Sequence, residues 1–445
     1  MSKTAVRYHE IDMLKGLACV LMLVGHAMRS RMPVPHTFDK IVLHFMDFSG
    51  PIFFFVSGMN VMTFLERNAD KPGFRATRFY LAAAAVLFVL GFTYNLNRAS
   101  PVMDIFQGVA VCTVVVYLLM RLRMPTFVHW LIVIGFYAVY LLTLRLPVEI
   151  APRFAEFREL RAQVPLASDL FVSGISPALA ALFAAIRPLQ RWTMIHFGFL
   201  QWITFFYVGA LCYRSVTRPK PRTWPWWALF GVLFVVGPFL GWGVFGRGQN
   251  LLDAIFLDTF LDLMLRGIPS YVAMTLGGAG LLYLVSRRHY PGASEYQNPV
   301  LRFLADRSEM LGKESFMFLI VHWWLISTVL AVEHALPLNP YLRSALVIAG
   351  TVFFVPVFAR LRDRLAAKSS FATKTAVFMI AGLMLTFLSL GIIGGLVRGF
   401  GPSPYYIEIP LYVSYLVSFG FAFVYPTLRL KLRRRYTTAL PAGEA

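Results

Sequence analysis

The chain is too apolar to be a soluble globular protein. Of its 445 residues, 58% are hydrophobic and 14% are charged, and its mean hydropathy is +0.64, whereas soluble domains carry about 25% charged residues. Its formal net charge of +20 is spread over many loops instead of forming one basic patch, which excludes nucleic acid as a partner. The composition therefore predicts an integral membrane protein that contacts membrane lipids along much of its surface.

Apolar runs recur along the whole chain, each with about the 20 residues that cross a hydrocarbon core of ~30 Å. About twelve are expected: 12–29, 41–64, 77–97, 101–120, 127–146, 195–213, 226–245, 268–286, 315–332, 341–360, 374–397 and 409–428. They predict an all-α polytopic membrane protein with about 10 to 12 transmembrane helices in one bundle. No linker divides the chain, so residues 1–435 are expected to form a single domain, followed by a short flexible cytoplasmic tail at 436–445.

The basic residues indicate the orientation of these helices. With both termini in the cytoplasm, roughly twice as many Lys and Arg residues fall in inner segments as in outer ones, which is the positive-inside pattern. The basic run at 429–435 is then expected to touch anionic lipid. We expect the protein to lie in a bacterial plasma (inner) membrane.

The first apolar segment carries three ionisable residues, Asp12, Lys15 and His26. At ~100° per residue, the eleven steps from Lys15 to His26 return to within roughly 20° of the same helical face, and Asp12 lies about 40° away. Charge that faces lipid costs roughly 2.5 to 3.5 kcal/mol on insertion scales, so this face is expected to point into a polar protein interior. The stripe is the first candidate site, and His26 is its candidate general base.

The second segment is rich in phenylalanine and continues into the small residues Ser57 and Gly58. Such residues let either another helix or a ligand come close. Asp47 lies near the outer end of this segment, at about the depth of His26. A carboxylate there would fix the tautomer of the imidazole and raise its basicity.

Arg75 and Arg78 follow just inside the membrane, three residues apart and therefore on one helical face. Arginine presents a fork of donors that matches phosphate oxygens, so the pair predicts a cytosolic ligand that bears phosphate. The alternative is that both residues anchor the helix at the inner surface of the membrane.

Later segments hold further polar residues: Asp104 and Gln107 near the outer end of the fourth segment, and His322 midway along the ninth. A single histidine in a membrane helix also serves as a packing partner, so His322 alone indicates no chemistry. The three cysteines have unrelated spacing and form neither a disulfide framework nor a metal motif.

Together these features resemble the transmembrane acyltransferase superfamily, which includes the acyltransferase-3 enzymes and the heparan-alpha-glucosaminide N-acetyltransferase-like family. The first segment is similar to their opening pattern of an acidic residue, a basic residue followed by glycine, and a later histidine. In this chain the pattern is Asp12, Lys15-Gly16 and His26. Lys15 departs from acyltransferase-3 members, which usually have arginine here, and lysine lacks the bidentate fork.

The resemblance extends to other segments. They are the phenylalanine-rich stretch that ends in Ser57-Gly58, the Arg75 and Arg78 pair, the stretch from Asp104 to Gly108, and the late helix from Ser315 to His322. The specific part covers roughly residues 7–110, with a weaker echo at 312–323.

This resemblance implies an enzyme that moves an acyl group, usually acetyl, from cytosolic acyl-CoA to a hydroxyl or amine across the membrane. The acceptor is expected to be a glycan, a lipid-linked sugar or another cell-envelope molecule. His26 and Asp47 are the expected catalytic residues, with His26 either as a general base or as a transiently acylated intermediate. Lys15, Ser57, Arg75 and Arg78 are expected to hold the acetyl-CoA donor, and Asp104, Gln107 and His322 the acceptor. No metal is expected, and a homodimer is compatible with the sequence.

Two other functions fit part of the pattern. A proton-coupled secondary transporter also uses about twelve helices and intramembrane charge, here the stripe of Asp12, Lys15 and His26. However, no repeat relates residues 1–215 to 226–430. A catalytically inactive flippase or assembly partner of a glycan pathway is the third alternative.

Overall fold

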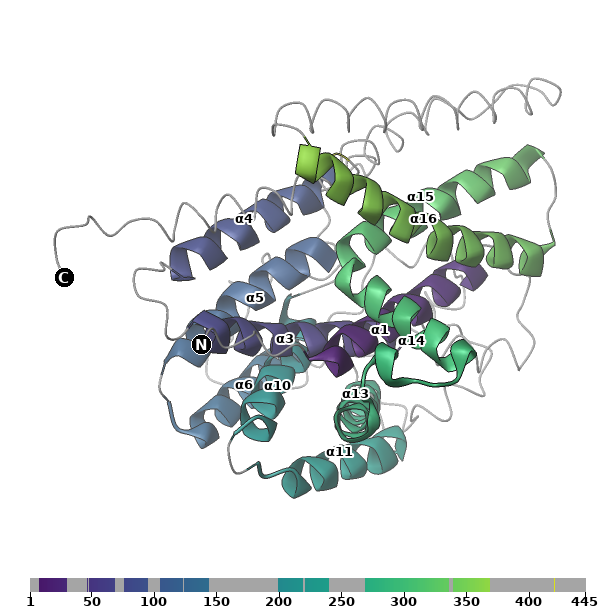
Figure 1. Ribbon diagram of the computed structural model, residues 1–445. Coiled ribbons are helices and arrows are strands. Elements are labelled where there is room, and N and C mark those ends of the chain that lie inside the picture. Colours follow the sequence, from purple (N-terminus) through teal and green to yellow (C-terminus); the bar gives the residue numbers. More distant parts are fainter. Residues whose placement is uncertain are drawn as a thin grey trace, which may run out of the picture. The chain divides into compact units, whose positions relative to one another are not determined.

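The computed structural model describes residues 8–29, 46, 48–68, 76–94, 105–122, 124–143, 199–218, 221–239, 269–335, 339–368 and 420. Within these residues all regular secondary structure is helical, as the all-α prediction requires (Figure 1). The helices are α1 (His9–Arg29), α3 (Ser49–Asn68), α4 (Ala76–Tyr94), α5 (Ile105–Arg121), α6 (Thr126–Thr143), α10 (Phe199–Val216), α11 (Trp224–Val236), α13 (Pro269–His289), α14 (Pro299–Lys313), α15 (Ser315–Ala335) and α16 (Pro340–Lys368). Two short 3-10 turns, η2 (Gly237–Phe239) and η5 (Ala293–Glu295), follow α11 and α13.

Ten of these helices overlap ten of the twelve expected membrane spans, and α14 falls outside all of them. The other two spans, 374–397 and 409–428, fall outside the described helices. In the described part of the chain, one helical stretch, Tyr341–Arg364, is both long and apolar enough to cross a bilayer. Shorter apolar helices lie at Thr77–Phe88, Ile105–Arg121, Thr126–Tyr140, Trp224–Phe239 and Ser315–Ile326.

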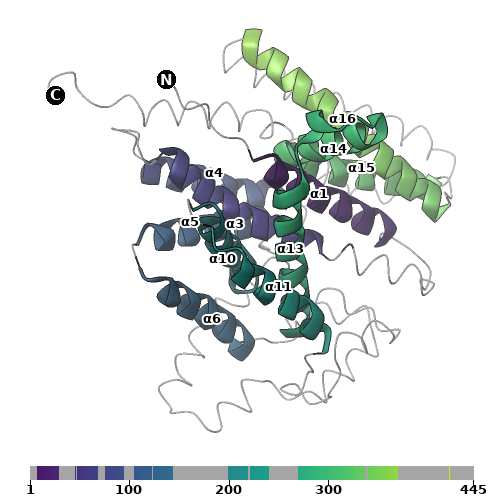
Figure 2. The ribbon, with the colours of Figure 1, turned by 60° about the horizontal axis from the view of Figure 1, so that its bottom comes forward.

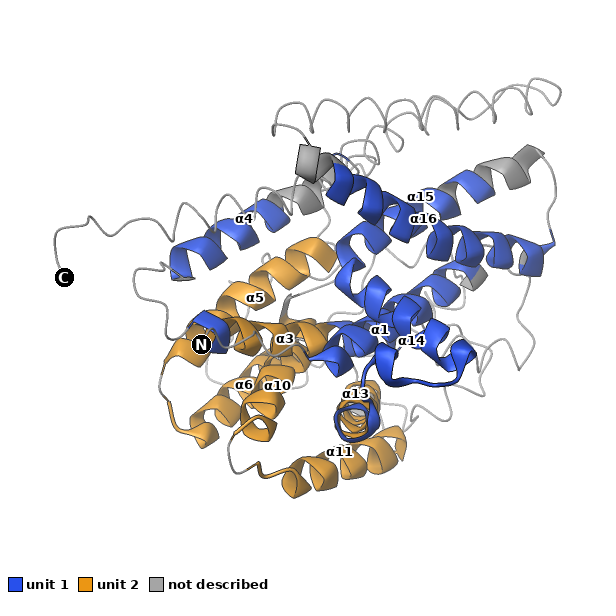
Figure 3. Ribbon diagram, viewed as in Figure 1, with its two compact units in different colours: residues 1–53, 66–100, 286–445 blue, residues 54–65, 101–285 orange. Residues whose placement is uncertain are grey.

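The helices group into two compact units that are interleaved along the chain (Figure 3). Unit 1 comprises residues 1–53, 66–100 and 286–445, and unit 2 comprises residues 54–65 and 101–285. Both α3 and α13 contribute residues to the two units.

In unit 1, α1 and α14 cross at backbone contact because each has a glycine at the crossing. A Cβ atom on Gly16 would lie 1.7 Å from the carbonyl oxygen of Ser308, and one on Gly312 would lie 1.9 Å from that of Asp12. Small residues at such positions allow the closest approach of two helices. The glycine of the Lys15-Gly16 motif is therefore required by the helix crossing. Helices α15 and α16 also contact α1 and each other.

Helix α14 was not predicted from the sequence, because it has no long apolar run. A local signal was nevertheless present. The side chain of Asn298 caps the helix by accepting hydrogen bonds from the amides of Val300 (2.9 Å) and Leu301 (3.2 Å), and Pro299 follows the cap. Asparagine at the cap with proline at the first helical position is a standard start signal. By the expected topology, α14 lies on the cytoplasmic side, between the inward span of α13 and the outward span of α15.

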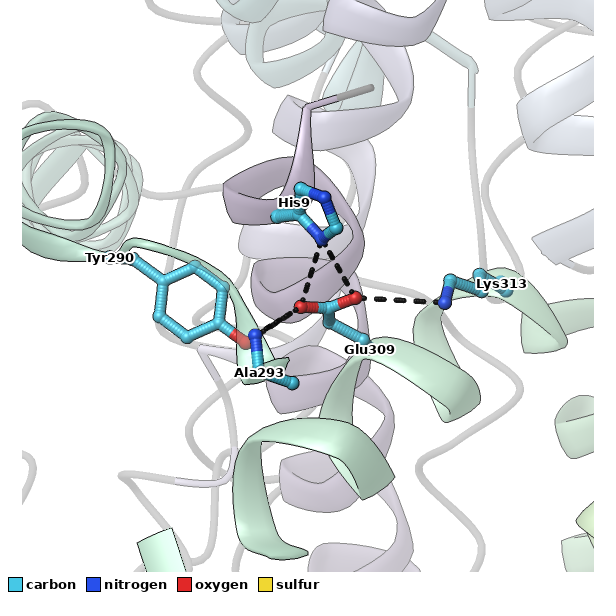
Figure 4. Close-up of polar contacts among 5 residues, drawn as sticks. All are labelled: His9, Tyr290, Ala293, Glu309 and Lys313. Carbon is cyan, nitrogen blue, oxygen red and sulfur yellow. Dashed lines mark hydrogen bonds and ion pairs between the residues drawn. The ribbon is translucent and has the colours of Figure 1, made fainter. Parts of the chain in front are cut away.

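A buried carboxylate fastens α14 to the start of α1 and to the turn after α13 (Figure 4). Glu309 accepts hydrogen bonds from His9 Nδ1 (3.1 Å to each oxygen), the Tyr290 hydroxyl (3.0 Å) and the Ala293 amide (2.9 Å), and it lies 3.6 Å from Lys313 Nζ. Burial alone would raise the pKa of Glu309, but the hydrogen bonds from Ala293, His9 and Tyr290 outweigh it and hold this pKa below its ordinary value. The carboxylate is therefore charged at neutral pH and holds three segments together.

Two further ion pairs join segments of unit 1 near the same end of α1. Arg287 donates to Glu10 over 3.1 Å, and Arg362 forms a bidentate pair with Glu314, with distances of 2.6 and 2.9 Å. Bidentate pairs of this kind fix geometry as well as charge. The first pair connects the end of α13 to the start of α1, and the second connects the junction of α14 and α15 to the last turns of α16.

In unit 2, α10 contacts both α5 and α6, and it lies beside them in both views of the ribbon (Figures 1 and 2). In the unit-2 part of α3, Phe54 packs against α10 and stacks on Trp202 with ring centroids 4.8 Å apart. The backbone of Phe206 in α10 lies against Gly58. Within this unit, Gly58 therefore serves helix packing.

Candidate functional site

The crossing of α14 over α1 brings α15 beside the outer half of α1. Leu311, at the end of α14, places its carbonyl oxygen 4.0 Å from the Cys19 sulfur in α1. His26 lies seven residues beyond Cys19, and His322 lies seven residues beyond Ser315, where α15 begins. Seven residues advance a helix by ~10 Å. His26 on α1 and His322 on α15 therefore lie at the same level along the two helices.

His26 and His322 form the centre of the candidate site. Nδ1 of His26 lies 3.2 Å from Nε2 of His322, and the two rings are nearly parallel, with planes 7° apart. His322 is fully buried, and its Nδ1 lies 2.9 Å from the carbonyl oxygen of Phe318 one turn earlier in α15. His26 is partly exposed. The structure thus joins two histidines that are 296 residues apart in sequence.

Aromatic rings hold the pair in place. The Phe318 ring stacks on His322 with a centroid distance of 4.6 Å, and the Trp323 ring lies 4.7 Å from His26. Neither aromatic residue was assigned to the site from the sequence. Phe318 lies four residues before His322, and Trp323 directly follows His322. This spacing is the sequence signal that could have identified them.

Helix α16 adds two polar residues near the outer end of α1. The hydroxyl of Ser344 donates to the carbonyl oxygen of Ala27, the residue after His26, over 3.2 Å. Its neighbour Arg343 is almost fully buried, with 1% of its surface exposed. Arg343 was not among the site residues expected from the sequence, although a buried arginine in a membrane protein often marks a functional region.

Lys15 lies on α1 eleven residues before His26, which is ~16 Å along the helix axis. Its ammonium group sits 5.5 Å above the ring of Phe53, within range of a cation–π contact. Lys15 and His26 therefore lie at different levels of α1.

The other expected site residues fall into two groups. Asp47, Arg75 and Asp104 lie outside the described residues, so the roles predicted for them stay predictions. Arg78 is exposed in the first turn of α4, while Ser57 and Gln107 are buried in α3 and α5 of unit 2. Among the residues that the structure describes, no group of three or more His, Cys, Asp and Glu side chains is arranged to hold a metal ion.

The described geometry brings His322, expected at the acceptor, into direct contact with His26. An imidazole with a hydrogen-bonded partner at one nitrogen and a reactive second nitrogen is the usual arrangement of a histidine base. The site therefore has the parts of a proton-transfer centre, set in an apolar region of the chain.

A comparison of the sequence with models of protein families found a match. The acyltransferase-3 family model, described as an acyltransferase domain, matches residues 8–360. This span begins at the start of α1, ends within α16 and includes both histidines. A search of curated proteins found none that matches the chain. The family match bears out the resemblance inferred from the first two segments, and the chain belongs to the acyltransferase-3 family of membrane acyltransferases.

Proposed function

We propose that this membrane acyltransferase moves an acyl group, most simply acetyl, from cytosolic acyl-CoA to a hydroxyl or amine of a glycan or other cell-envelope acceptor on the opposite side. The observation that carries the proposal is the hydrogen-bonded pair of His26 and His322. His26 lies ~16 Å beyond Lys15 along α1. A donor that enters from the cytoplasm and an acceptor that enters from outside would meet at this level.

In the proposed reaction His26 acts as a general base. It takes the proton from the acceptor as the oxygen or nitrogen attacks the thioester carbonyl, and a carbon–oxygen or carbon–nitrogen bond forms. The carbon–sulfur bond then breaks, and the departing CoA thiolate takes the proton back from His26. The products are the acylated acceptor and free CoA, and the base is restored.

Lys15 and the arginine pair have supporting parts in this proposal. Arg75 and Arg78 would hold the phosphates of CoA in the cytoplasm. The Lys15 ammonium, held over Phe53, would attract the pantetheine or diphosphate portion as the thioester passes towards His26. Ser57 is assigned to the thioester oxygen on the family resemblance.

The test is transfer of labelled acetyl from acetyl-CoA by purified protein in proteoliposomes, with a panel of membrane and cell-envelope glycans as acceptors. We expect His26→Ala to lower the rate by at least about 100-fold, the lower limit of a general-base contribution, without loss of folded protein. The matched control is His289→Ala, which removes an exposed histidine at the end of α13 and is expected to leave the rate unchanged.

Full activity of the His26→Ala protein would contradict the proposed mechanism. Proton flux that depends on substrate, without any acetyl transfer by the wild-type protein, would instead support the transporter alternative.

A further inference from the structure

We propose that His322 is a positioning residue that fixes the tautomer of His26, so that Nε2 of His26 is the nitrogen that reacts. This inference rests on the proposed function, because it assigns a partner to the proposed base. It differs from the acceptor-binding role that the family resemblance implied for His322.

The hydrogen bond inside α15 determines where the protons lie. A carbonyl oxygen only accepts hydrogen bonds, so Nδ1 of His322 carries the proton that it donates to Phe318. A fully buried imidazole is favoured in its neutral form. Neutral His322 with a proton on Nδ1 has an unprotonated Nε2, which is an acceptor.

The contact between the histidines then has one direction. Since Nε2 of His322 accepts, Nδ1 of His26 must carry the proton that lies between them over 3.2 Å. Neutral His26 therefore has its lone pair on Nε2. The carbonyl of Phe318 thus sets the tautomer of His26 through His322, in the same way that a neighbouring group orients a catalytic histidine in other enzymes.

The packing around the pair favours this single arrangement. Phe318 stacks on one face of His322, and Trp323 lies close to His26. Rings held by neighbours in this way lose little further entropy when the reaction begins, which is the physical basis of preorganisation. His26 is thereby held ready to accept a proton at Nε2.

The arrangement also helps the reaction once His26 is protonated. When Nε2 takes the proton from the acceptor, His26 becomes an imidazolium ion and its Nδ1–H still donates to His322. A hydrogen bond from a charged donor is about twice as strong as one between neutral groups. His322 therefore stabilises the intermediate without forming or breaking a bond to the substrate.

Two substitutions of His322 separate positioning from a purely structural role. In His322→Gln, the amide group reaches roughly the position of Nε2, so its oxygen can accept from His26 while its nitrogen donates to Phe318. In His322→Asn, the shorter side chain reaches roughly the position of Nδ1, so it can bond to Phe318 but not to His26. Both variants keep a neutral amide inside the helix, so each serves as the folding control for the other.

We expect His322→Asn to lower kcat by about 10- to 100-fold, the loss that is usual when the partner that orients a metal-bound histidine is removed. The KM for acetyl-CoA is expected to stay unchanged, because the donor does not contact His322. His322→Gln is expected to recover most of the lost kcat. Folding is compared through thermal unfolding of the purified proteins.

Equal activity of the Asn and Gln variants, whether high or low, would overturn the inference, because the two differ in their reach to His26. A rise in the KM for the acceptor with unchanged kcat would also overturn it and would restore the acceptor-binding role. The wild-type protein and His26→Ala are measured in the same assay. If the wild type transfers no acetyl group, or if His26→Ala is fully active, the result contradicts the proposed function itself and not only the role of His322.

Discussion

A histidine that takes a proton from an alcohol or amine has to be neutral and has to present one defined nitrogen. In our proposal, His26 presents one defined nitrogen because its Nδ1 is bound to His322, whose own Nδ1 donates to the Phe318 carbonyl. Two of the ring nitrogens are thus engaged with each other, and one is engaged with the backbone. At the scale of single residues, the site is a short chain of hydrogen bonds that runs from the Phe318 carbonyl through His322 to His26.

The arginine pair permits a prediction at the same scale. We expect the double variant Arg75→Ala with Arg78→Ala to raise the KM for acetyl-CoA by about 10-fold or more while kcat stays nearly unchanged. The reason is that a hydrogen bond to a charged group contributes about 1.5 to 3 kcal/mol, and 1.4 kcal/mol corresponds to a factor of ten. Initial-rate kinetics at varied acetyl-CoA measures both constants.

The control for the arginine pair is Arg360→Ala, which removes another exposed arginine near the cytoplasmic end of α16. Its KM is expected to equal that of the wild type. If the double variant binds acetyl-CoA as tightly as the wild type, Arg75 and Arg78 serve as membrane anchors instead.

At the scale of helices, the site depends on how α14 is held. Its crossing with α1 determines where α15 begins, and the carboxylate of Glu309 fastens the same helix to His9 and to the turn after α13 (Figure 4). Gly16 and Gly312 face backbone atoms of the opposite helix, so neither helix has room for a side chain at the crossing. A displacement of α14 is therefore expected to move His322 away from His26.

This dependence predicts the effect of adding one methyl group. Gly16→Ala is expected to lower the free energy of unfolding by at least about 1 to 3 kcal/mol, the usual cost of overpacking, because its Cβ would lie 1.7 Å from a backbone oxygen. The activity of the remaining folded protein is expected to fall as well. Thermal unfolding and acetyl transfer by the purified variant measure the two effects.

Gly135→Ala provides the matched control within α6, because a Cβ there meets no atom within 4 Å. Alanine is favoured over glycine in a helix by roughly 1 kcal/mol, so this variant is expected to be as stable as the wild type or slightly more stable. Similar stability of the two glycine variants would show that the crossing tolerates a side chain.

At the scale of the whole molecule, the distribution of basic residues predicts from which side the donor enters. With both termini in the cytoplasm, the arginine pair faces the cytoplasm and His26 lies further out. We expect inside-out membrane vesicles to use acetyl-CoA from the medium, whereas sealed right-side-out vesicles are expected to use it only after permeabilisation. Transfer of label from the medium by sealed right-side-out vesicles would contradict this orientation.

Several properties were predictable from the sequence because they depend on composition or on neighbouring residues. Hydropathy predicted helices in ten segments where the structure describes them, since a buried apolar span must satisfy its backbone hydrogen bonds internally. The motif of Asp12, Lys15-Gly16 and His26 indicated the family that the match over residues 8–360 bears out. Helix α14 was missed because its start signal is local and its polar face breaks the apolar run.

The sequence by itself determined that this protein is helical, apolar and a member of the acyltransferase-3 family, and that His26 is its candidate base. Only the tertiary structure decided which residue lies against this candidate base, because His26 and His322 are 296 residues apart and no local pattern links them. The physical link is the close crossing of α1 and α14, where two glycines allow backbone contact and thereby set the level of α15. A hydrogen bond of 3.2 Å depends on that level, and helix periodicity alone does not specify it.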